Sequence, residues 1–392
     1  MVVRNGCDIG VIGLGVMGRN LVANMADKGF SVGAYDPWPE ALASFAESEA
    51  VGFDGVETAQ SAEALVALLQ VPRMILLMVK AGEPVDDLID SLTPLLEPGD
   101  IIIEGGNAHY EDTNRRARSL AQFDLHFLGL GVSGGEEGAR HGPALMAGGS
   151  PAAYTRAEPL LTAIAAKAGD EPCCAHLGSG GAGHFIKTIH NGIEYAVMQV
   201  IAEGYVLLRD GAGLGHEAMA DVFREWSAGG LESYLISITA DILETQDDLG
   251  GGPLVEKILD TAGQKGTGRW SAEAALAVGI PAPTIAEAVA ARSLGELRDM
   301  RLSVSRALNG PPLAPPADAK DTVKVVGDGL RGAAIAVYAQ GFSVISAAAK
   351  AYGWDTSMAA VARVWQNGCI IRARLLDDIA AAYQAAPDTQ NL

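Results

Sequence analysis

The hydrophobic pattern of this chain changes once, near Gly183, and this change limits the folds that the chain can adopt. Before Gly183, short strand-like apolar runs alternate with segments of helical periodicity, a pattern typical of a parallel sheet covered by helices. After Gly183, Ala-, Leu- and Glu-rich segments follow one another with helical periodicity. The sequence therefore predicts a doubly wound α/β domain over residues 1–180 and a large all-α domain over residues 181–392.

The apolar runs also place individual elements. Strands are expected at residues 8–13, 31–35, 74–79, 100–104 and 125–129, and the first helix is expected at residues 16–28. In the second half, Thr284 and Glu287 have the spacing of a capping box, which places a helix start just after Pro283.

Composition argues against several classes of partner. The formal net charge of −20 argues against nucleic acid, because phosphate backbones need a basic surface. The longest apolar run, residues 74–79, is far shorter than the roughly 20 residues that span a bilayer, so no membrane partner is expected. The four cysteines lack the spacing of metal ligands, and reduced thiols fit a cytoplasmic protein without a metal site.

A glycine-rich turn, Gly13-Leu14-Gly15-Val16-Met17-Gly18, directly follows the first expected strand and opens a helix. In this context the pattern is typical of dinucleotide binding. The first glycine allows a tight turn, the second lets the backbone approach a pyrophosphate, and the third lets the helix pack on the strand. The alternative is a glycine turn that serves packing only.

Asp36 ends the second expected strand, where a carboxylate hydrogen-bonds the hydroxyls of an adenosine ribose. A carboxylate there repels a 2′-phosphate, and the following Pro37-Trp38-Pro39 adds no cation. The sequence therefore predicts NAD rather than NADP. In the alternative, Asp36 faces solvent and Arg19 or Lys80 holds the phosphate.

Other glycine-rich segments can bind anions. Residues 129–139 follow a strand and offer a serine hydroxyl and successive backbone N–H groups to a carboxylate. Residues 262–268 contain Lys265 and Thr267, which suit a phosphate. Gly105-Gly106-Asn107 ends a strand at the carboxyl edge of the sheet, where ligands bind in open α/β folds.

Residues 184–195 concentrate acid, base and amide groups. On a helix, one face would carry Lys187, His190, Asn191, Glu194 and Tyr195, beside an apolar face that buries the helix. This arrangement predicts a rigid catalytic platform, and the alternative is an amphipathic helix with a solvated polar face. Likewise, His190 can be a core histidine, and Arg292 can be a surface arginine.

Together these motifs resemble the decarboxylating 6-phosphogluconate dehydrogenases, a family within the β-hydroxyacid dehydrogenases. The resemblance runs from Asp8 to the end of the chain and is carried by residues 13–18, 79–82, 104–107, 131–139, 184–195 and 262–268. It implies an α/β Rossmann-like doubly wound domain, a large all-helical substrate and dimerisation domain, and a homodimer.

The resemblance also implies a role for each matching residue. Lys187 is the implied general base, and Glu194 is the implied general acid. The implied substrate-binding residues are Asn107, Ser133, Gly134, Gly135, His190, Asn191 and Tyr195, with Lys265, Thr267 and Arg292 around the substrate phosphate. The implied cofactor-binding residues are Gly13, Leu14, Gly15, Val16, Met17, Gly18, Asp36, Val79, Lys80, Ala81 and Asn107.

The implied reaction is the oxidative decarboxylation of 6-phosphogluconate to ribulose 5-phosphate and CO₂. Lys187 takes the proton of the 3-hydroxyl as hydride leaves C3 for the nicotinamide, which requires a lysine whose pKa is lowered by burial and by neighbouring positive charge. Glu194 then protonates C1 of the enediol.

The chain departs from this family in two places. NADP-using members usually have Asn-Arg-Thr where this chain has Asp36-Pro37-Trp38, and long members continue past the position of residue 392 with a tail that lends an arginine and a histidine to the partner's substrate site. Two alternatives stay open. One is a dehydrogenase for another β-hydroxy acid, which has no need of the phosphate-binding residues, and the other is a catalytically disabled NAD-binding protein.

Overall fold

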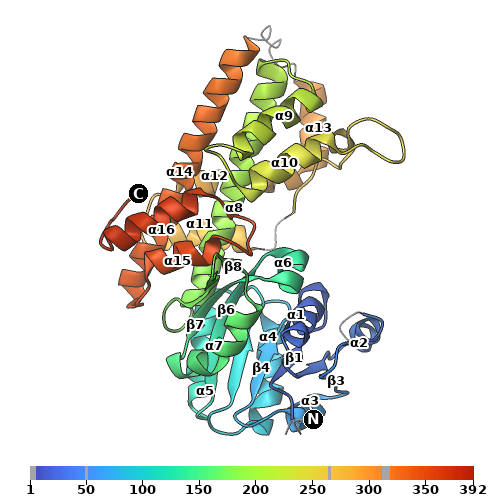
Figure 1. The fold of residues 1–392 in the computed structure, drawn as a ribbon, viewed down its shortest axis with the longest axis vertical. Coiled ribbons are helices and arrows are strands. Elements are labelled where there is room, and N and C mark those ends of the chain that lie inside the picture. Colours follow the sequence, from blue (N-terminus) through green and yellow to red (C-terminus); the bar gives the residue numbers. More distant parts are fainter. Residues whose placement is uncertain (1–5, 49–51, 264–265, 309, 311–317) are drawn as a thin grey trace. The chain divides into compact units, whose positions relative to one another are not determined.

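The computed structural model describes residues 6–48, 52–263, 266–308, 310 and 318–392. Contacts divide the chain into two compact units, one made of Met1–Thr188 with Ala349–Ile370 and the other of Ile189–Ala348 with Ile371–Leu392. Figure 1 shows that the first unit contains the sheet and that the second is built of helices.

An eight-stranded sheet organises the first unit. Its strands are β1 (Ile9–Ile12), β2 (Val32–Tyr35), β3 (Val56–Thr58), β4 (Met74–Leu77), β5 (Ile101–Glu104), β6 (His126–Ser133), β7 (Ala144–Gly149) and β10 (Cys174–His176). Their order is β10-β7-β6-β5-β4-β1-β2-β3, and neighbours run parallel except β6 and β7. The direction of the strand order reverses between β1 and β4, and ligands of open α/β folds bind at such a switch point, beyond the carboxyl ends of the strands.

Helices bury both faces of this sheet. The helices of the first unit are α1 (Val16–Asp27), α2 (Pro39–Ala46), α3 (Ala62–Leu68), α4 (Glu83–Leu92), α5 (Tyr110–Ala121), α6 (Gly135–His141), α7 (Pro151–Ile164) and α15 (Met358–Trp365), and a small separate ladder joins β8 (Lys167–Ala168) to β9 (Glu171–Pro172). In β5, Ile101 and Ile103 belong to one apolar cluster and Ile102 to another, so successive side chains enter cores on opposite faces.

The predicted doubly wound fold is confirmed, and four of the five predicted strands lie within two residues of the observed boundaries. The predicted end of the fifth strand at residue 129 is wrong, because β6 continues to Ser133 and α6 begins at Gly135. Strand β7 was not anticipated. Its sequence, Ala-Leu-Met-Ala-Gly-Gly, lacks the β-branched and aromatic residues that mark strands, and its pairing with β6 determines it instead.

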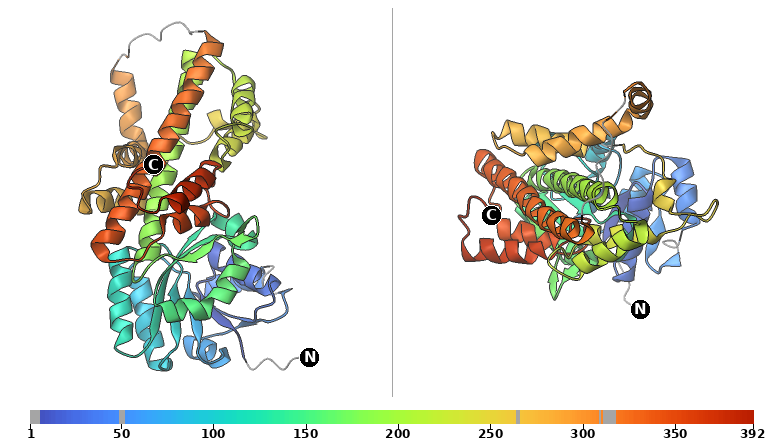
Figure 2. Two further views of the ribbon diagram at one scale, coloured as in Figure 1. Left: turned by 60° about the vertical axis from the view of Figure 1, so that its left-hand side comes forward. Right: turned by 90° about the horizontal axis from the view of Figure 1, so that it is seen from above.

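Helices form the second unit, as the sequence predicts. They are α9 (His216–Ser227), α10 (Tyr234–Glu244), α11 (Thr267–Ala277), α12 (Pro283–Glu296), α13 (Arg298–Ala307) and α16 (Leu375–Ala385), together with most of α8 (Ala182–Val206) and of α14 (Ala319–Tyr352). Figure 2 shows α8 in green beside α14 in orange. Glycine brings these helices close, because a Cβ at Gly341 of α14 would lie 2.5 Å from Cδ1 of Ile193 on α8.

Helix α12 begins where the sequence predicts, at Pro283, but the capping box is wrong. Its N-cap is Ala282, whose methyl side chain cannot accept a hydrogen bond from the first turn of the helix. The N–H and hydroxyl of Thr284 both donate to Oε1 of Gln340 on α14, the N–H at 3.1 Å. A tertiary partner therefore replaces the local cap that the spacing suggested.

Among the described residues, α14 is long and apolar enough to cross a membrane by length and composition alone. Its most apolar window is 39% buried in the structure. Core helices of helical proteins meet the same criterion, so this property by itself assigns no location.

Candidate active site

The glycine turn after β1 has the geometry that its sequence predicts. Gly13 has a φ of +99°, and a Cβ there would lie 2.6 Å from the carbonyl oxygen of Met78. A Cβ at Gly18 would lie 1.8 Å from the carbonyl oxygen of Gly13, so this glycine lets α1 pack directly on the turn. No described atom beyond its chain neighbours lies within 4 Å of a Cβ built on Gly15, which leaves that backbone open to a pyrophosphate. The turn therefore fits a dinucleotide.

Asp36 lies beside this turn, at the end of β2. Its carboxylate accepts the N–H of Leu14 at 2.7 Å and the N–H of Trp38 at 2.9 Å, and the residue is only 5% exposed. The alternative in which Asp36 faces solvent is therefore wrong. The carboxylate fixes the turn and stays next to it, where an adenosine ribose would lie.

The ends of β4 and β5 meet next to the turn. A Cβ at Gly106 would lie 2.5 Å from the carbonyl oxygen of Val79, so the segment after β5 packs on the segment after β4. Lys80 and Asn107 are exposed on these two segments, and Ala81 is half-buried. The structure thus brings the predicted cofactor-binding residues of β1, β4 and β5 together at the switch point of the sheet.

Ser133 and Gly134 end β6 in a tight environment. Ser133 is 2% exposed. Gly134 has a φ of +119°, and a Cβ there would lie 2.6 Å from the carbonyl oxygen of Gly368, so only glycine fits. Gly135 is exposed and opens α6, which places its backbone N–H at a helix start.

Lys187 lies on α8 and packs over β6. A Cβ at Gly131 would lie 2.5 Å from Cβ of Lys187, so the glycine makes room for the lysine stem. Gly131 and Ser133 are two residues apart on one strand and therefore point to the same face. Lys187 itself is 7% exposed. The predicted base thus lies on the strand face that also carries the predicted substrate-binding serine.

The polar residues that follow Lys187 on α8 interact with each other. Nδ1 of His190 lies 3.1 Å from Oδ1 of Asn191 and 3.8 Å from Oε2 of Glu194. His190 is fully buried, Asn191 is 8% exposed, and the Glu194 side chain is 17% exposed. The interpretation of α8 as an amphipathic helix with a solvated polar face is therefore wrong, because the polar face is buried as well.

Three elements of the second unit meet at Tyr195. The guanidinium of Arg292 lies 4.0 Å from the centre of the Tyr195 ring, and its Nη1 donates to the carbonyl of Gly263 at 3.4 Å. A Cβ at Gly268 would lie 2.3 Å from the same ring. Thr267 is 4% exposed at the start of α11. Arg292 is therefore not an isolated surface arginine, whereas Lys265 lies outside the described residues.

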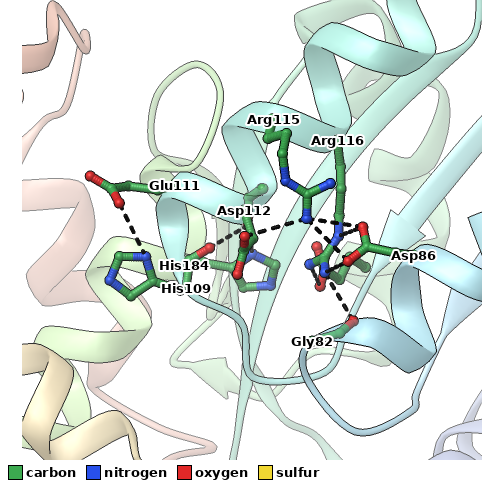
Figure 3. A network of polar contacts seen from close by, with 10 residues as sticks. Gly82, Asp86, His109, Glu111, Asp112, Arg115, Arg116 and His184 are labelled. Carbon is green, nitrogen blue, oxygen red and sulfur yellow. Dashed lines mark hydrogen bonds and ion pairs between the residues drawn. The ribbon is translucent and has the colours of Figure 1, made fainter.

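A buried polar network, which the sequence did not reveal, lies behind the segments after β4 and β5 (Figure 3). Nη1 of Arg116 on α5 donates to Oε1 of Glu104 at 2.7 Å, and Nε and Nη2 donate to the two oxygens of Asp86 at 2.9 Å. Burial raises the pKa of Glu104 to about 7 although Arg116 opposes this shift. The hydrogen bonds from Arg116 lower the pKa of Asp86 to about 2.

The same network reaches α8. Nδ1 of His184 lies 2.7 Å from Oγ1 of Thr113 on α5. His184 is 1% exposed, and burial lowers its pKa to about 4, so the ring is neutral near pH 7. Helix α5 thus holds the first turn of α8 through a neutral hydrogen bond.

Two family models match the chain on either side of α8. The NAD binding domain of 6-phosphogluconate dehydrogenase matches residues 8–178, and the 6-phosphogluconate dehydrogenase C-terminal domain matches residues 183–392.

Several proteins with curated names resemble the chain over nearly its whole length. The decarboxylating 6-phosphogluconate dehydrogenase of Schizosaccharomyces pombe is 49% identical over 386 residues, which are 98% of this chain and 78% of that protein. The corresponding protein of Haemophilus ducreyi is 50% identical over 381 residues, 97% of this chain and 78% of that protein. The solved 6-phosphogluconate dehydrogenase of Plasmodium falciparum, described in its apo form, with NADP⁺ and with 6-phosphogluconate, has a TM-score of 0.94 at 38% identity and covers 98% of this chain and 83% of its own. With both of its halves matched by models of this family and relatives about half identical over nearly its whole length, this chain belongs to the 6-phosphogluconate dehydrogenase family.

Proposed function

We propose that this chain oxidises and decarboxylates 6-phosphogluconate to ribulose 5-phosphate and CO₂, with NAD as its preferred electron acceptor. The observation that carries this proposal is the buried Lys187, which packs on the face of β6 that ends in Ser133. The relatives described above bear the name of this decarboxylating enzyme and are about half identical to the chain.

Lys187 is assigned the role of general base. Its amine accepts the proton of the 3-hydroxyl, while a bound nicotinamide supplies the acceptor for the hydride of C3. Because the residue is 7% exposed, bulk water has little access to this proton transfer. The protonated lysine then polarises the new 3-ketone. The ketone accepts the electron pair of the breaking bond to the carboxylate, so CO₂ leaves and an enediol forms.

Glu194 is assigned the role of general acid. It lies on the same helix as Lys187, two turns further along, and Nδ1 of His190 lies 3.8 Å from its Oε2. A partly exposed carboxyl group there can take a proton from solvent and pass it to C1 of the enediol. As C1 is protonated, the amine of Lys187 accepts the proton of the enediol hydroxyl at C2, so the ketone forms and ribulose 5-phosphate is complete.

The substrate phosphate is assigned to Thr267 and Arg292. Arg292 is held by the Tyr195 ring and by the Gly263 carbonyl, so its guanidinium is oriented before a ligand binds. The predicted contribution of Lys265 stays a prediction, since that residue lies outside the described part of the chain. Arg292 thus supplies a positive charge for the substrate phosphate in a protein with a net charge of −20.

Asp36 supports the preference for NAD. Each of its carboxylate oxygens accepts one backbone N–H and retains an acceptor position for a ribose hydroxyl. A 2′-phosphate at the same place would meet the negative charge of this buried carboxylate. The Plasmodium relative is described with NADP⁺, so the preference for NAD rests on Asp36 and on the following Pro37-Trp38-Pro39, which adds no cation.

Initial rates with 6-phosphogluconate, run with NAD and with NADP, test the reaction and the cofactor together. We expect kcat/KM with NAD to exceed that with NADP by about tenfold or more, because repulsion between close charges near a protein surface reaches about 4 kcal/mol, above the roughly 1.4 kcal/mol of a tenfold ratio. In Asp36→Ala the ratio of kcat/KM with NAD to kcat/KM with NADP should fall toward one.

Asp8→Ala is the matched control for Asp36→Ala. Asp8 precedes β1 and accepts the N–H of Ser31 at 2.8 Å, at the opposite edge of the sheet, so its loss should leave the ratio unchanged. An unchanged ratio in Asp36→Ala would contradict the role given to Asp36. Turnover of an unphosphorylated β-hydroxy acid in place of 6-phosphogluconate would contradict the reaction itself.

We also propose that the chain forms a homodimer, and α13 supports this proposal. Within the described residues, α13 buries none of its own side chains. Its exposed apolar residues, together with the two that flank the helix, form one stripe at helical spacing, namely Leu297, Met300, Val304 and Leu308. A contiguous exposed apolar stripe of this kind marks an interaction site.

Sedimentation velocity measures this association. We expect a dimer for the unmodified chain and a monomer for Met300→Lys/Val304→Lys, because two charges in an apolar contact must be desolvated. Ser303→Lys, on another side of α13, should remain dimeric. A monomeric unmodified chain would refute the proposal.

The cytoplasmic location expected from the sequence stays a prediction.

A further inference from the structure

Arg116 is a fully buried arginine whose hydrogen bonds join the start of α4 to the end of β5. Its side chain is 1% exposed, and its guanidinium donates to Glu104 at the end of β5, to Asp86 on α4 and to the carbonyl oxygen of Gly82 at 3.1 Å. All three nitrogen atoms of the guanidinium are therefore engaged. Figure 3 shows the contacts of Arg116 with Asp86 and with Gly82 as dashed lines.

The two segments that Arg116 joins carry predicted cofactor-binding residues. Gly82 directly follows residues 79–81, and Glu104 directly precedes Gly105-Gly106-Asn107. Gly82 has a φ of +95° and a ψ of −142°, a conformation that is essentially open to glycine only. The hydrogen bond from Arg116 to the carbonyl oxygen of Gly82 therefore fixes the direction of this peptide group, in a backbone conformation that essentially only glycine adopts.

The nicotinamide half of a bound dinucleotide would lie over these segments. In a doubly wound sheet the adenosine half lies over the first βαβ unit, which here ends in Asp36, and the other mononucleotide lies over the strands beyond the switch point. The first two strands beyond it are β4 and β5. Arg116 thus lies beneath the part of the site where hydride is transferred.

Stability alone does not explain a buried arginine here. An ion pair with both side chains 1% exposed pays a desolvation penalty that its attraction hardly exceeds, and apolar replacements of similar volume are often as stable. A planar guanidinium, by contrast, holds several acceptors in fixed directions. The geometry therefore favours a positional role.

The helix that carries Arg116 also holds the helix of the base. One turn before Arg116, Thr113 bonds to His184, and His184 lies one turn before Lys187 on α8. A displacement of α5 would therefore move the cofactor segments and the start of α8 together.

We propose that Arg116 is a positioning residue of the dehydrogenase site, which holds the segments after β4 and β5 at the separation that a nicotinamide ring requires. The inference rests on the proposed function for its kinetic consequence, but its binding consequence is independent of turnover.

The test uses the double variant Arg116→Met/Glu104→Gln. The single Arg116→Met would leave Glu104 buried without its cation and can unfold, whereas the double variant removes both buried charges and keeps their volume. Asp86 keeps Arg115 as a partner at 3.1 Å in this variant. Arg115→Met is the matched control, because Arg115 precedes Arg116 on α5 but is 54% exposed.

Calorimetric titration with NADH and with ADP-ribose separates the two halves of the cofactor. In the double variant we expect the Kd of ADP-ribose to stay within about twofold, because Asp36 and the glycine turn are untouched, and the Kd of NADH to rise about tenfold. In Arg115→Met both constants should stay unchanged. Equal changes for the two ligands, or no change for either, would overturn the proposal.

Turnover provides the second readout. We expect kcat of the double variant to fall about 10²-fold while KM for 6-phosphogluconate changes little, since a small misplacement of reacting groups has effects of this size. A folded double variant with normal kcat would also overturn the proposal. An unmodified chain without turnover would refute the proposed function, and the NADH and ADP-ribose constants would still decide the role of Arg116.

Discussion

Replacing Lys187 with methionine should lower kcat with 6-phosphogluconate and NAD by about 10³-fold or more, because general base catalysis contributes factors of this size and methionine has no group that accepts a proton. Methionine keeps an unbranched stem over Gly131, so α8 and β6 should still pack. The glycine turn and Asp36 lie on other strands. The Kd of NADH should therefore stay within about threefold of the unmodified value.

Stopped-flow absorbance at the nicotinamide band measures the loss, since it records hydride transfer directly. Lys350→Met is the matched control, because Lys350 is an exposed lysine at the end of α14 and its removal should leave kcat unchanged. Normal turnover in Lys187→Met would eliminate Lys187 as the base. If Lys187→Met lost both NADH binding and turnover, the result would indicate that Lys187 binds the cofactor instead.

Replacing Glu194 with glutamine should lower steady-state kcat by about 10²-fold and leave the first hydride transfer intact. The amide keeps the shape of the side chain and its contact with His190, but it cannot donate a proton to C1 of the enediol as an acid does. Reduced cofactor should therefore form in a fast burst equal to the number of active sites, followed by slow turnover.

Rapid mixing detects the burst, and product formed in deuterium oxide reports protonation at C1. Glu203→Gln is the control, because Glu203 lies further along α8, is exposed and hydrogen-bonds Gln199, so it should show normal turnover without a burst. If Glu194→Gln slows the burst itself, Glu194 acts before decarboxylation and its assignment as the final acid is wrong.

The sequence predicted elements well where hydrophobic period and chain punctuation agree. Strand β1, the glycine turn and α1 follow from an apolar run, three glycines and a helical pattern that all favour the same boundaries. It failed where a tertiary contact decides the structure. Strand β7 is determined by its pairing with β6, and the N-terminal hydrogen bonds of α12 depend on Gln340, which lies 56 residues beyond Thr284.

Site residues follow the same distinction. The shared helix of Lys187 and Tyr195 could be predicted because this segment carries polar groups at helical spacing beside an apolar stripe, while their roles stay predictions. Arg116 was missed because it stands among other arginines, Arg115 and Arg118, that are solvent-facing or only partly buried in the structure. A signal was nevertheless present. Buried positions of α5 recur at Tyr110, Thr113, Arg116 and Leu120, so helical periodicity alone places one arginine on the apolar stripe.

Because glycine has no side chain, position 131 constrains chimeric proteins made from two relatives. Gly131 falls in the segment matched by the family's N-terminal model, and Lys187 falls in the segment matched by its C-terminal model. Because a Cβ at 131 would lie 2.5 Å from the lysine's own Cβ, the two parents of any chimera joined between them must agree on this one contact. A crossover that respects the boundary between the two matched segments can therefore still inherit a displaced base, when the parent that supplies the strand carries anything larger than hydrogen at this position.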